Sequence, residues 1–187
     1  MSSALDSEID AALSGNQPIP KEKVLAWVEN ASELLTLSKL YRLTDQAYYR
    51  IRPELGMDAT CGLIQHYLLE CIKQNIEGND EIQSRFDACQ TLHVWFCHLS
   101  EMEGTSPVLT RAVRALTDLF LARDDTQYTI ETTFLEHALE MTELRPYFEF
   151  WETDDRLRPA WERAMEWGES HPSFVWGMIQ RRSARKD

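Results

Sequence analysis

Residues 58–72, DATCGLIQHYLLECI, decide the fold class of this chain. The apolar side chains recur in pairs spaced four residues apart, at Leu63, Ile64, Tyr67, Leu68, Cys71 and Ile72. Residues four apart lie above one another on one face of an α-helix, whereas a half-buried strand alternates at every second residue. The stretch therefore predicts a helix with one strongly apolar face.

The same helical period extends in both directions from this stretch. A first, weak helix is predicted at about residues 3–13. The other helices are predicted at about residues 21–41 with a joint at Ala31-Ser32, 43–51, 58–77, 81–100, 107–121, 126–141, 143–151, 155–169 and 172–183. Residues 81–100 are apolar over most of the helix circumference, so we expect this helix to lie near the centre of the fold.

Residues that commonly begin or end helices separate these segments. Asp58 or Thr60, and later Ser106, are predicted N-caps, because their side-chain oxygens can accept from unpaired backbone N–H groups. Gly78 with Asn79, and Gly168, are predicted to end helices. Further breaks are expected at residues 18–20, Gly104, Asp124-Asp125 and Thr153-Asp154.

The fold class that follows is all-α. Short connections favour antiparallel neighbours, so eight or nine helices are expected in an irregular bundle or a short α-solenoid. A chain of 187 residues suits one domain, residues 1–187, with a mobile N-terminus at 1–18 and a basic tail at 180–187.

The sequence also bears on the location of the chain. No stretch approaches the roughly 18 apolar residues of a membrane span. Asp6, Glu8 and Asp10 stand where a secretory signal would carry positive charge and an apolar block. We therefore expect a cytoplasmic protein that does not enter a membrane.

Negative charge is concentrated in one part of the chain. The net charge is −12, and residues 124–169 hold thirteen acids against four arginines. The last eight residues, QRRSARKD, are by contrast basic. Binding to nucleic acid needs a basic surface, so we do not expect a nucleic-acid partner.

Aromatic residues are interspersed among these acids. Either they form the core beneath a solvated acidic face, or some stay exposed as interface anchors. On the second interpretation the chain binds a basic protein partner, such as a toxin, as an immunity or antitoxin-type inhibitor. The expected partner-binding residues are Glu143, Glu149, Trp151, Glu152, Asp154, Asp155, Glu162 and Glu166.

A second hypothesis is a metal-binding protein or enzyme centred on Cys89 and His93. Cys89, His93, Cys97 and Glu101 follow one another at intervals of four residues, and a Cys/His pair at that spacing can chelate zinc. One helix cannot close a tetrahedron, so Cys61, His66 or Cys71 would have to contribute. The alternative is a buried stripe of reduced thiols with a hydrogen-bonded histidine.

No common catalytic motif is present. The sequence lacks GxGxxG, GxxxxGK[ST] and GxSxG, and Glu136, His137 and Glu140 do not complete an HExxH or Glu-x-x-His motif. We therefore expect no catalytic residue, no metal ligand, no cofactor and no enzymatic activity. A third hypothesis is a small acidic adaptor or chaperone for secreted proteins.

The C-terminal third resembles a group of small bacterial all-helical proteins, some of them similar to immunity proteins that neutralise toxins. The resemblance lies in TFLEHALE at 133–140 and in Leu144, Tyr147-Phe148, Trp151, Leu157, Ala160-Trp161 and Trp167-Gly168. It implies a helical inhibitor and assigns no catalytic residue.

Overall fold

The computed structural model describes residues 4–15, 19–46 and 55–170, and within them the fold is all-α. Every regular element in these ranges is a helix, which confirms the predicted fold class. None of the described helices has the length and apolar character needed to cross a membrane. The helices predicted at 47–51 and 172–183, and the basic tail at 180–187, lie outside the described residues.

The chain divides into two compact units, residues 1–88 and 89–187, and each is described by itself. The predicted single domain, its bundle or solenoid topology, and the central place of residues 81–100 stay predictions. If one unbroken helix at 124–140 is counted once, the described residues hold nine α-helices, which agrees with the eight or nine expected.

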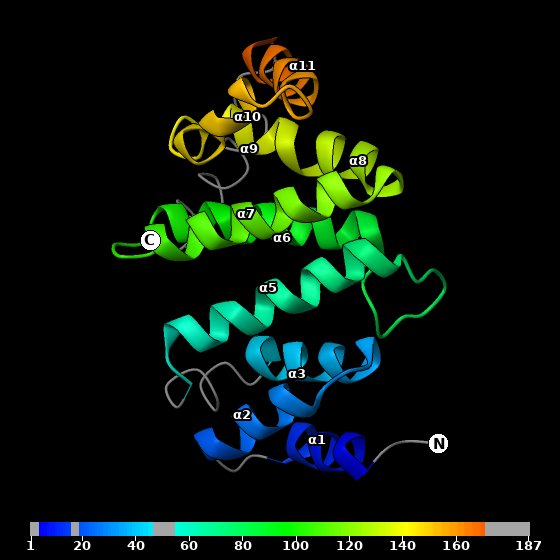
Figure 1. Cartoon of the computed structure of the whole chain (residues 1–187). Coiled ribbons are helices and arrows are strands. Elements are labelled where there is room, and N and C mark those ends of the chain that lie inside the picture. Colours follow the sequence, from blue (N-terminus) through cyan, green and yellow to red (C-terminus); the bar gives the residue numbers. More distant parts are fainter. Residues whose placement is uncertain (1–3, 16–18, 47–54, 171–187) are drawn as a thin grey trace, which may run out of the picture. The chain divides into compact units, whose positions relative to one another are not determined.

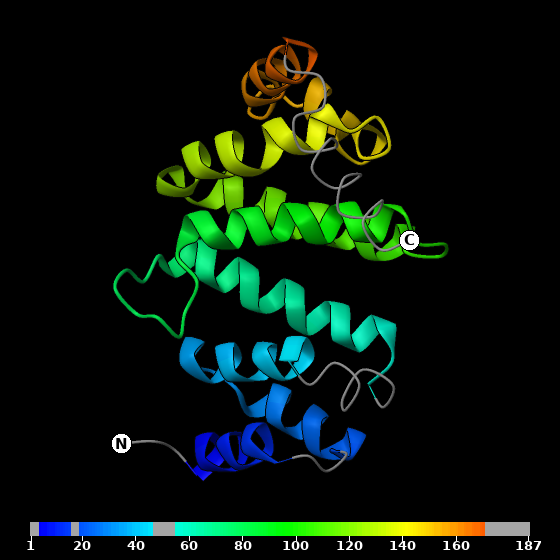
Figure 2. The ribbon, with the colours of Figure 1, turned by 180° about the vertical axis from the view of Figure 1, so that it is seen from behind.

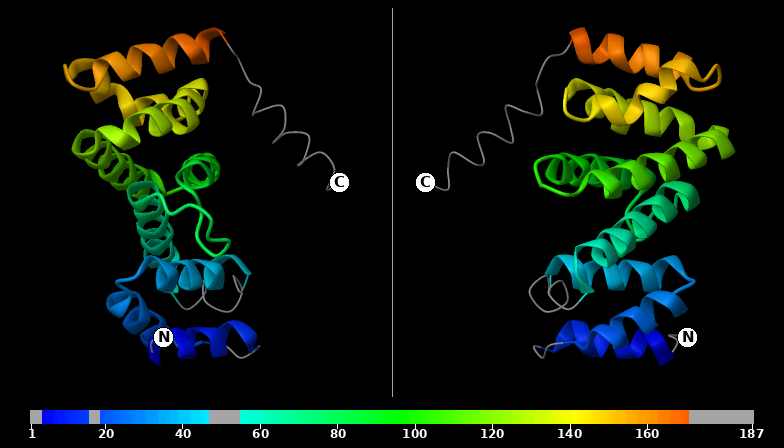
Figure 3. Two further views of the ribbon diagram at one scale, coloured as in Figure 1. Left: turned by 90° about the vertical axis from the view of Figure 1, so that its right-hand side faces the viewer. Right: turned by 60° about the vertical axis from the view of Figure 1, so that its left-hand side comes forward.

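Helix α3 is the central element of the first unit. The helices are α1 (Ala4–Ser14), α2 (Lys21–Asn30), α3 (Leu34–Gln46) and α5 (Met57–Gln74). Figures 1 and 3 show α3 between α5 on one side and α1 with α2 on the other, and α3 packs against all three. The joint expected at Ala31-Ser32 is present, because α2 ends at Asn30.

Polar bonds attach α1 to α3. Thr36 donates a 2.8 Å hydrogen bond to Asp6 Oδ1, and Lys39 Nζ lies 2.7 Å from Asp10 Oδ2. Both α3 side chains are buried, so their polar atoms need such partners. Residues 4–14 of the segment expected to be mobile thus form a helix with specific contacts to α3.

Helix α5 contains the stretch that decides the fold class, and its apolar stripe is buried. Two predicted boundaries were wrong. Asp58 and Thr60 lie inside the first turn after Gly56, and Thr60 Oγ1 donates to the Gly56 carbonyl rather than capping an N–H group. The helix ends at Asn75, whose left-handed φ of 49° lets its N–H bond Cys71 O, before Gly78 is reached.

The second unit begins within α6, and its described residues continue to Ser170. Its elements are α6 (Arg85–Ser100), α7 (Ser106–Ala122), α8 (Asp124–Thr129), the π-helix η1 (Ile130–Leu135), α9 (Glu136–Glu140), the 3-10 helix η2 (Arg145–Phe148), α10 (Glu149–Thr153) and α11 (Arg158–Ser170). The break expected at Thr153-Asp154 is confirmed. The break expected at Asp124-Asp125 lies instead at Arg123, and both aspartates belong to the first turn of α8. Elements α8, η1 and α9 form one helix with a π segment in its middle.

Two helices of this part of the chain start at other residues than predicted. Helix α6 begins four residues after Glu81, where Ser84 Oγ accepts from the Asp87 N–H in a 3.1 Å capping bond. Helix α7 is preceded by Thr105, so the predicted cap, Ser106, is its first helical residue.

Five aromatic side chains form a continuous core in the second unit. Their ring centroids are separated by 5.0 Å between Phe96 and Phe134 and 6.0 Å between Phe134 and Phe148. The row of rings continues from Phe148 to Trp151, whose ring centroids are 5.9 Å apart, and from Trp151 to Phe120, whose ring centroids are 4.9 Å apart. These rings come from α6, η1, η2, α10 and α7, so this core holds most of the unit together.

Helix α11 approaches α9 very closely at Gly168. A Cβ atom on Gly168 would lie 3.3 Å from the Glu140 nitrogen and from the Leu139 carbonyl. Figure 2 shows α11 (orange) near α9 (yellow), and the two helices pack against each other. Gly168 was predicted to end this helix. It lies instead inside α11, where it permits the close contact.

Candidate functional site

The predicted partner-binding residues lie in the turn after α9, in α10, in the connection between α10 and α11, and in α11 itself. Their exposed members are Glu143, Glu149, Glu152, Asp155, Glu162 and Glu166. Asp154 is half-buried, and Trp151 is fully buried. The structure therefore separates the set into exposed carboxylates, one intermediate carboxylate and one core residue.

Trp151 is not available to a partner, and its assignment as a binding residue was wrong. Its indole Nε1 donates a 2.9 Å hydrogen bond to Thr117 Oγ1, and its side chain has no solvent exposure. The neighbouring Phe150 is 42% exposed and is the aromatic residue that α10 presents to solvent. Sequence reasoning missed Phe150, because a helix of five residues has too few turns to reveal which of two adjacent aromatics faces inward.

Two of the predicted carboxylates are bound by the chain's own arginines. Asp154 lies 2.9 Å from Arg156 Nη2, and hydrogen bonds from this guanidinium lower the pKa of Asp154. Asp155 forms an ion pair with Arg158. Asp154 and Asp155 therefore contribute less free charge to a partner surface than the sequence suggests.

A third ion pair joins α11 to η1. Arg163 donates two hydrogen bonds to the Glu131 carboxylate, of 2.6 Å to Oε1 and 2.7 Å to Oε2. This bidentate arrangement is the strongest geometry for an arginine–carboxylate pair. It holds Glu131 in place and removes it from the set of carboxylates open to solvent cations.

Along α11, three glutamates form what we call the acidic face: Glu162, Glu166 and Glu169. They are spaced by four and three residues and so share one side of the helix. All three are exposed, and none forms an ion pair with another residue in the described part of the chain. Glu143, Glu149 and Glu152 share both properties. These six carboxylates are referred to as the open carboxylates.

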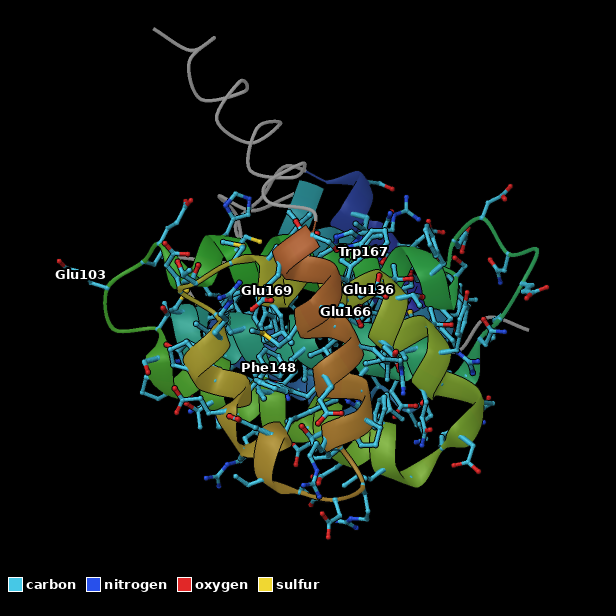
Figure 4. All side chains as sticks on the ribbon, turned by 90° about the horizontal axis from the view of Figure 1, so that it is seen from above. Glu103, Glu136, Phe148, Glu166, Trp167 and Glu169 are labelled. Atoms are coloured by element: carbon cyan, nitrogen blue, oxygen red, sulfur yellow. The ribbon has the colours of Figure 1, made fainter. Side chains whose placement is uncertain are left out.

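Small residues on the opposite side of α11 determine which side is exposed. Ala160, Ala164 and Gly168 recur every four residues and are buried. Trp167, also in α11, is 37% exposed. Figure 4 shows Glu166, Trp167 and Glu169 along α11, with Glu136 of the neighbouring α9 close by.

A second group of polar side chains lies inside the unit. His93 Nε2 is 3.4 Å from Cys97 Sγ, and Cys97 Sγ is 3.1 Å from Met141 Sδ. The ring centroid of His93 is 5.7 Å from that of His137, whose Nδ1 lies 2.9 Å from Glu140 Oε1. His93 and Cys97 from the predicted constellation therefore meet, while Glu101 is exposed and Cys61, His66 and Cys71 belong to the first unit.

Burial keeps this pair in its neutral forms. It lowers the pKa of His93 to about 4, with a further contribution from nearby His137, and raises the pKa of the Cys97 thiol to about 12. A catalytic cysteine needs the opposite arrangement, with a low thiol pKa and a charged histidine. The geometry therefore gives no support to nucleophilic catalysis at Cys97.

In the part of the chain that the structure describes, carboxylate, imidazole and thiol groups do not converge to form a metal site. Within residues 4–15, 19–46 and 55–170, no three His, Cys, Asp or Glu side chains are placed to hold a metal ion. Cys89, on which the metal hypothesis was centred, is buried in α6 one turn before His93. Sequence reasoning missed the approach of Met141 to this pair, because no periodic signal links residues so far apart in the chain.

Comparison with protein families, with curated proteins and with solved structures found no match.

Proposed function

We propose that this chain is an acidic protein-binding module, an inhibitor of the immunity or antitoxin type that acts on a basic partner in the cytoplasm. The observation that carries the proposal is the set of open carboxylates, six exposed side chains of α10, α11 and the preceding turn. Carboxylates that form no ion pair among the described residues can attract a cationic group of a partner. Asp154 and Asp155 belong to the rim of this surface, since their own arginines compete for them.

The open carboxylates would act mainly on the rate of association. Charges that remain solvated at the rim of an interface steer the encounter and suppress wrong partners, and contribute less to the energy of the final complex. The acidic face can occupy a basic site that otherwise holds phosphate groups, which is how an acidic protein would inhibit a nuclease.

Exposed aromatic side chains supply the apolar anchors that such an interface needs. Phe150 lies in α10 and Trp167 in α11, the two helices that hold five of the six open carboxylates. Aromatic residues dominate the energetics of many interfaces, and a tryptophan ring also attracts cationic side chains.

The test is a comparison of two triple variants in the native cell extract. One variant carries Glu162→Gln, Glu166→Gln and Glu169→Gln, and the matched control carries Glu22→Gln, Glu29→Gln and Glu33→Gln, which are exposed in the first unit. Proteins retained by each form at low and high salt are identified by mass spectrometry.

The proposal expects a basic protein that the wild type and the control retain, that the acidic-face variant loses, and that salt releases. Retention by the acidic-face variant, or contacts insensitive to salt, would contradict it. If the retained basic protein is a substrate of a secretion apparatus, the result favours an adaptor or chaperone and rejects the inhibitor.

A further inference from the structure

The proposed role of the open carboxylates does not account for the buried side chains around Cys97. His93 is 4% exposed, Cys97 3% and Met141 6%, and the sulfur of Cys97 faces both neighbours at 3.4 Å and 3.1 Å. A thiol, a thioether and an imidazole thus meet at one point, contributed by α6 and by the residue that follows α9. We propose that His93, Cys97 and Met141 form a site for a single cuprous ion, Cu(I).

The donor atoms select the metal. Hard cations such as Mg²⁺ and Ca²⁺ require several oxygen ligands, and zinc sites are built from thiolate, imidazole and carboxylate groups. No three His, Cys, Asp or Glu side chains among the described residues are placed for such a site. Thiolate and thioether sulfur are soft ligands that favour Cu(I), and imidazole is compatible with copper.

The site has room to adjust around an ion. Metal–sulfur bonds are about 2.3 Å long, so two sulfurs bound to one ion lie roughly 4 Å apart. The present separation of 3.1 Å must therefore widen by about 1 Å. Met141 follows the last residue of α9 with an extended backbone, φ −91° and ψ 115°, and its long unbranched side chain can make this adjustment.

A second layer of contacts orients the imidazole. The ring centroid of His93 lies 5.7 Å from that of His137, and groups placed behind a metal-binding histidine commonly fix its ring orientation. His137 is itself held by Glu140, at 2.9 Å, so the ring that faces Cys97 is supported from behind.

Binding replaces the thiol proton and involves no change of oxidation state. Cu(I) forms a bond to Cys97 Sγ, the S–H bond breaks, and the proton leaves to solvent. The ion and the thiolate neutralise each other, so the buried site gains no net charge. One proton is released for each ion bound, as is usual when a thiol becomes a ligand.

The experiment uses the full reduced chain under anaerobic conditions. Cu(I) is titrated in from its complex with bicinchoninate, whose colour reports how much metal the protein removes, and Zn²⁺ is titrated separately. The wild type is expected to remove one Cu(I) per chain, to release one proton, and to bind Zn²⁺ at least about 10-fold more weakly.

Variants at two of the ligands test the assignment. Cys97→Ser and Met141→Leu are each expected to weaken Cu(I) binding by about 10-fold or more. The matched controls are Cys61→Ser and Cys71→Ser, buried thiols of the first unit, which are expected to bind as the wild type does. Circular dichroism of each variant reports whether it folds. Met141→Leu conserves the side-chain volume, so this variant still tests the site if Cys97→Ser does not fold.

Three results would overturn the proposal. The first is failure of the wild type to remove copper from bicinchoninate. The second is wild-type affinity in a folded Cys97→Ser or Met141→Leu variant. The third is loss of binding in the Cys61→Ser or Cys71→Ser control, which would assign the metal to another thiol.

Discussion

The indole of Trp151 donates a 2.9 Å hydrogen bond to the hydroxyl of Thr117, and both side chains are buried. This bond joins α10 to α7 at one end of the aromatic core. The Thr117 hydroxyl in turn donates to the Val113 carbonyl, 2.8 Å away. The tryptophan that the sequence suggested as an interface anchor thus serves the interior of the second unit.

Replacement of Thr117 tests this role. Thr117→Val keeps the shape of the side chain but leaves the buried indole N–H without its acceptor, which should lower the free energy of unfolding by about 1–3 kcal/mol. The measurement is urea unfolding followed by tryptophan fluorescence. Phe150→Ala, which truncates the exposed neighbour, should change stability by about 0.5 kcal/mol or less. Equal effects of the two variants would show that the hydrogen bond between Trp151 and Thr117 does not stabilise the fold.

The class of the fold could be predicted, whereas the identity of the site could not. Helical periodicity follows from the backbone, so stretches such as residues 58–72 carry it even without knowledge of the tertiary structure. Trp151 and Phe150 are adjacent in a helix of five residues, where no period can tell inward from outward. The meeting of Cys97 with Met141, 44 residues later, depends on how α6 packs against the end of α9.

The same limit applies to charges. The concentration of thirteen acids in residues 124–169 is visible in the sequence. Which of them stay open depends on arginines that the fold brings close, as Arg163 is brought to Glu131 across 32 positions. Arg156 follows Asp154 by two residues and Arg158 follows Asp155 by three, so the neutralisation of these two carboxylates could have been predicted from the sequence.

Two glycines inside helices should respond in opposite ways to alanine. At Gly168 a methyl group would lie 3.3 Å from backbone atoms of α9, which cannot move easily, so Gly168→Ala should destabilise by about 1–3 kcal/mol. Gly62 lies in α5, where an added methyl group would meet no atom within 4 Å, so Gly62→Ala should stabilise by up to about 1 kcal/mol through helix propensity. Thermal unfolding of both variants checks the difference. A stabilising Gly168→Ala would contradict the close approach of α11 to α9.

Alkaline pH should destabilise the first unit through Tyr67. Its hydroxyl donates toward Ser38 and accepts from the Gln83 N–H, and burial raises its pKa to about 12. In the unfolded chain the Tyr67 hydroxyl loses its proton near pH 10. The contribution of the protonated hydroxyl to the free energy of unfolding is therefore complete below pH 10 and is lost as the pH rises towards 12. The loss should amount to about 2–3 kcal/mol.

Unfolding free energies measured between pH 9 and pH 12 test this dependence. Tyr67→Phe removes the hydroxyl group that titrates. The free energy of unfolding of this variant should therefore fall less steeply with pH than that of the wild type. The thiol of Cys71, whose pKa burial raises to about 11, contributes to the remaining slope. Identical slopes in the two proteins would mean that Tyr67 does not titrate differently on unfolding.

The acidic face should reduce the stability of the chain, and this cost is the strongest argument that it serves another purpose. Glu162 and Glu166 are like charges four residues apart, which destabilise a helix by about 0.2–0.5 kcal/mol. Glu166 and Glu169 are like charges three residues apart and add a similar cost. Replacement of all three by Gln should therefore stabilise the protein by about 0.5–1 kcal/mol at low salt, and less at high salt. Glu22 in the first turn of α2 is favourably placed for that helix dipole, so Glu22→Gln should destabilise by about 0.3–1 kcal/mol. If the triple variant is instead less stable than the wild type, these carboxylates support the fold, and their exposure gives no reason to infer a basic partner.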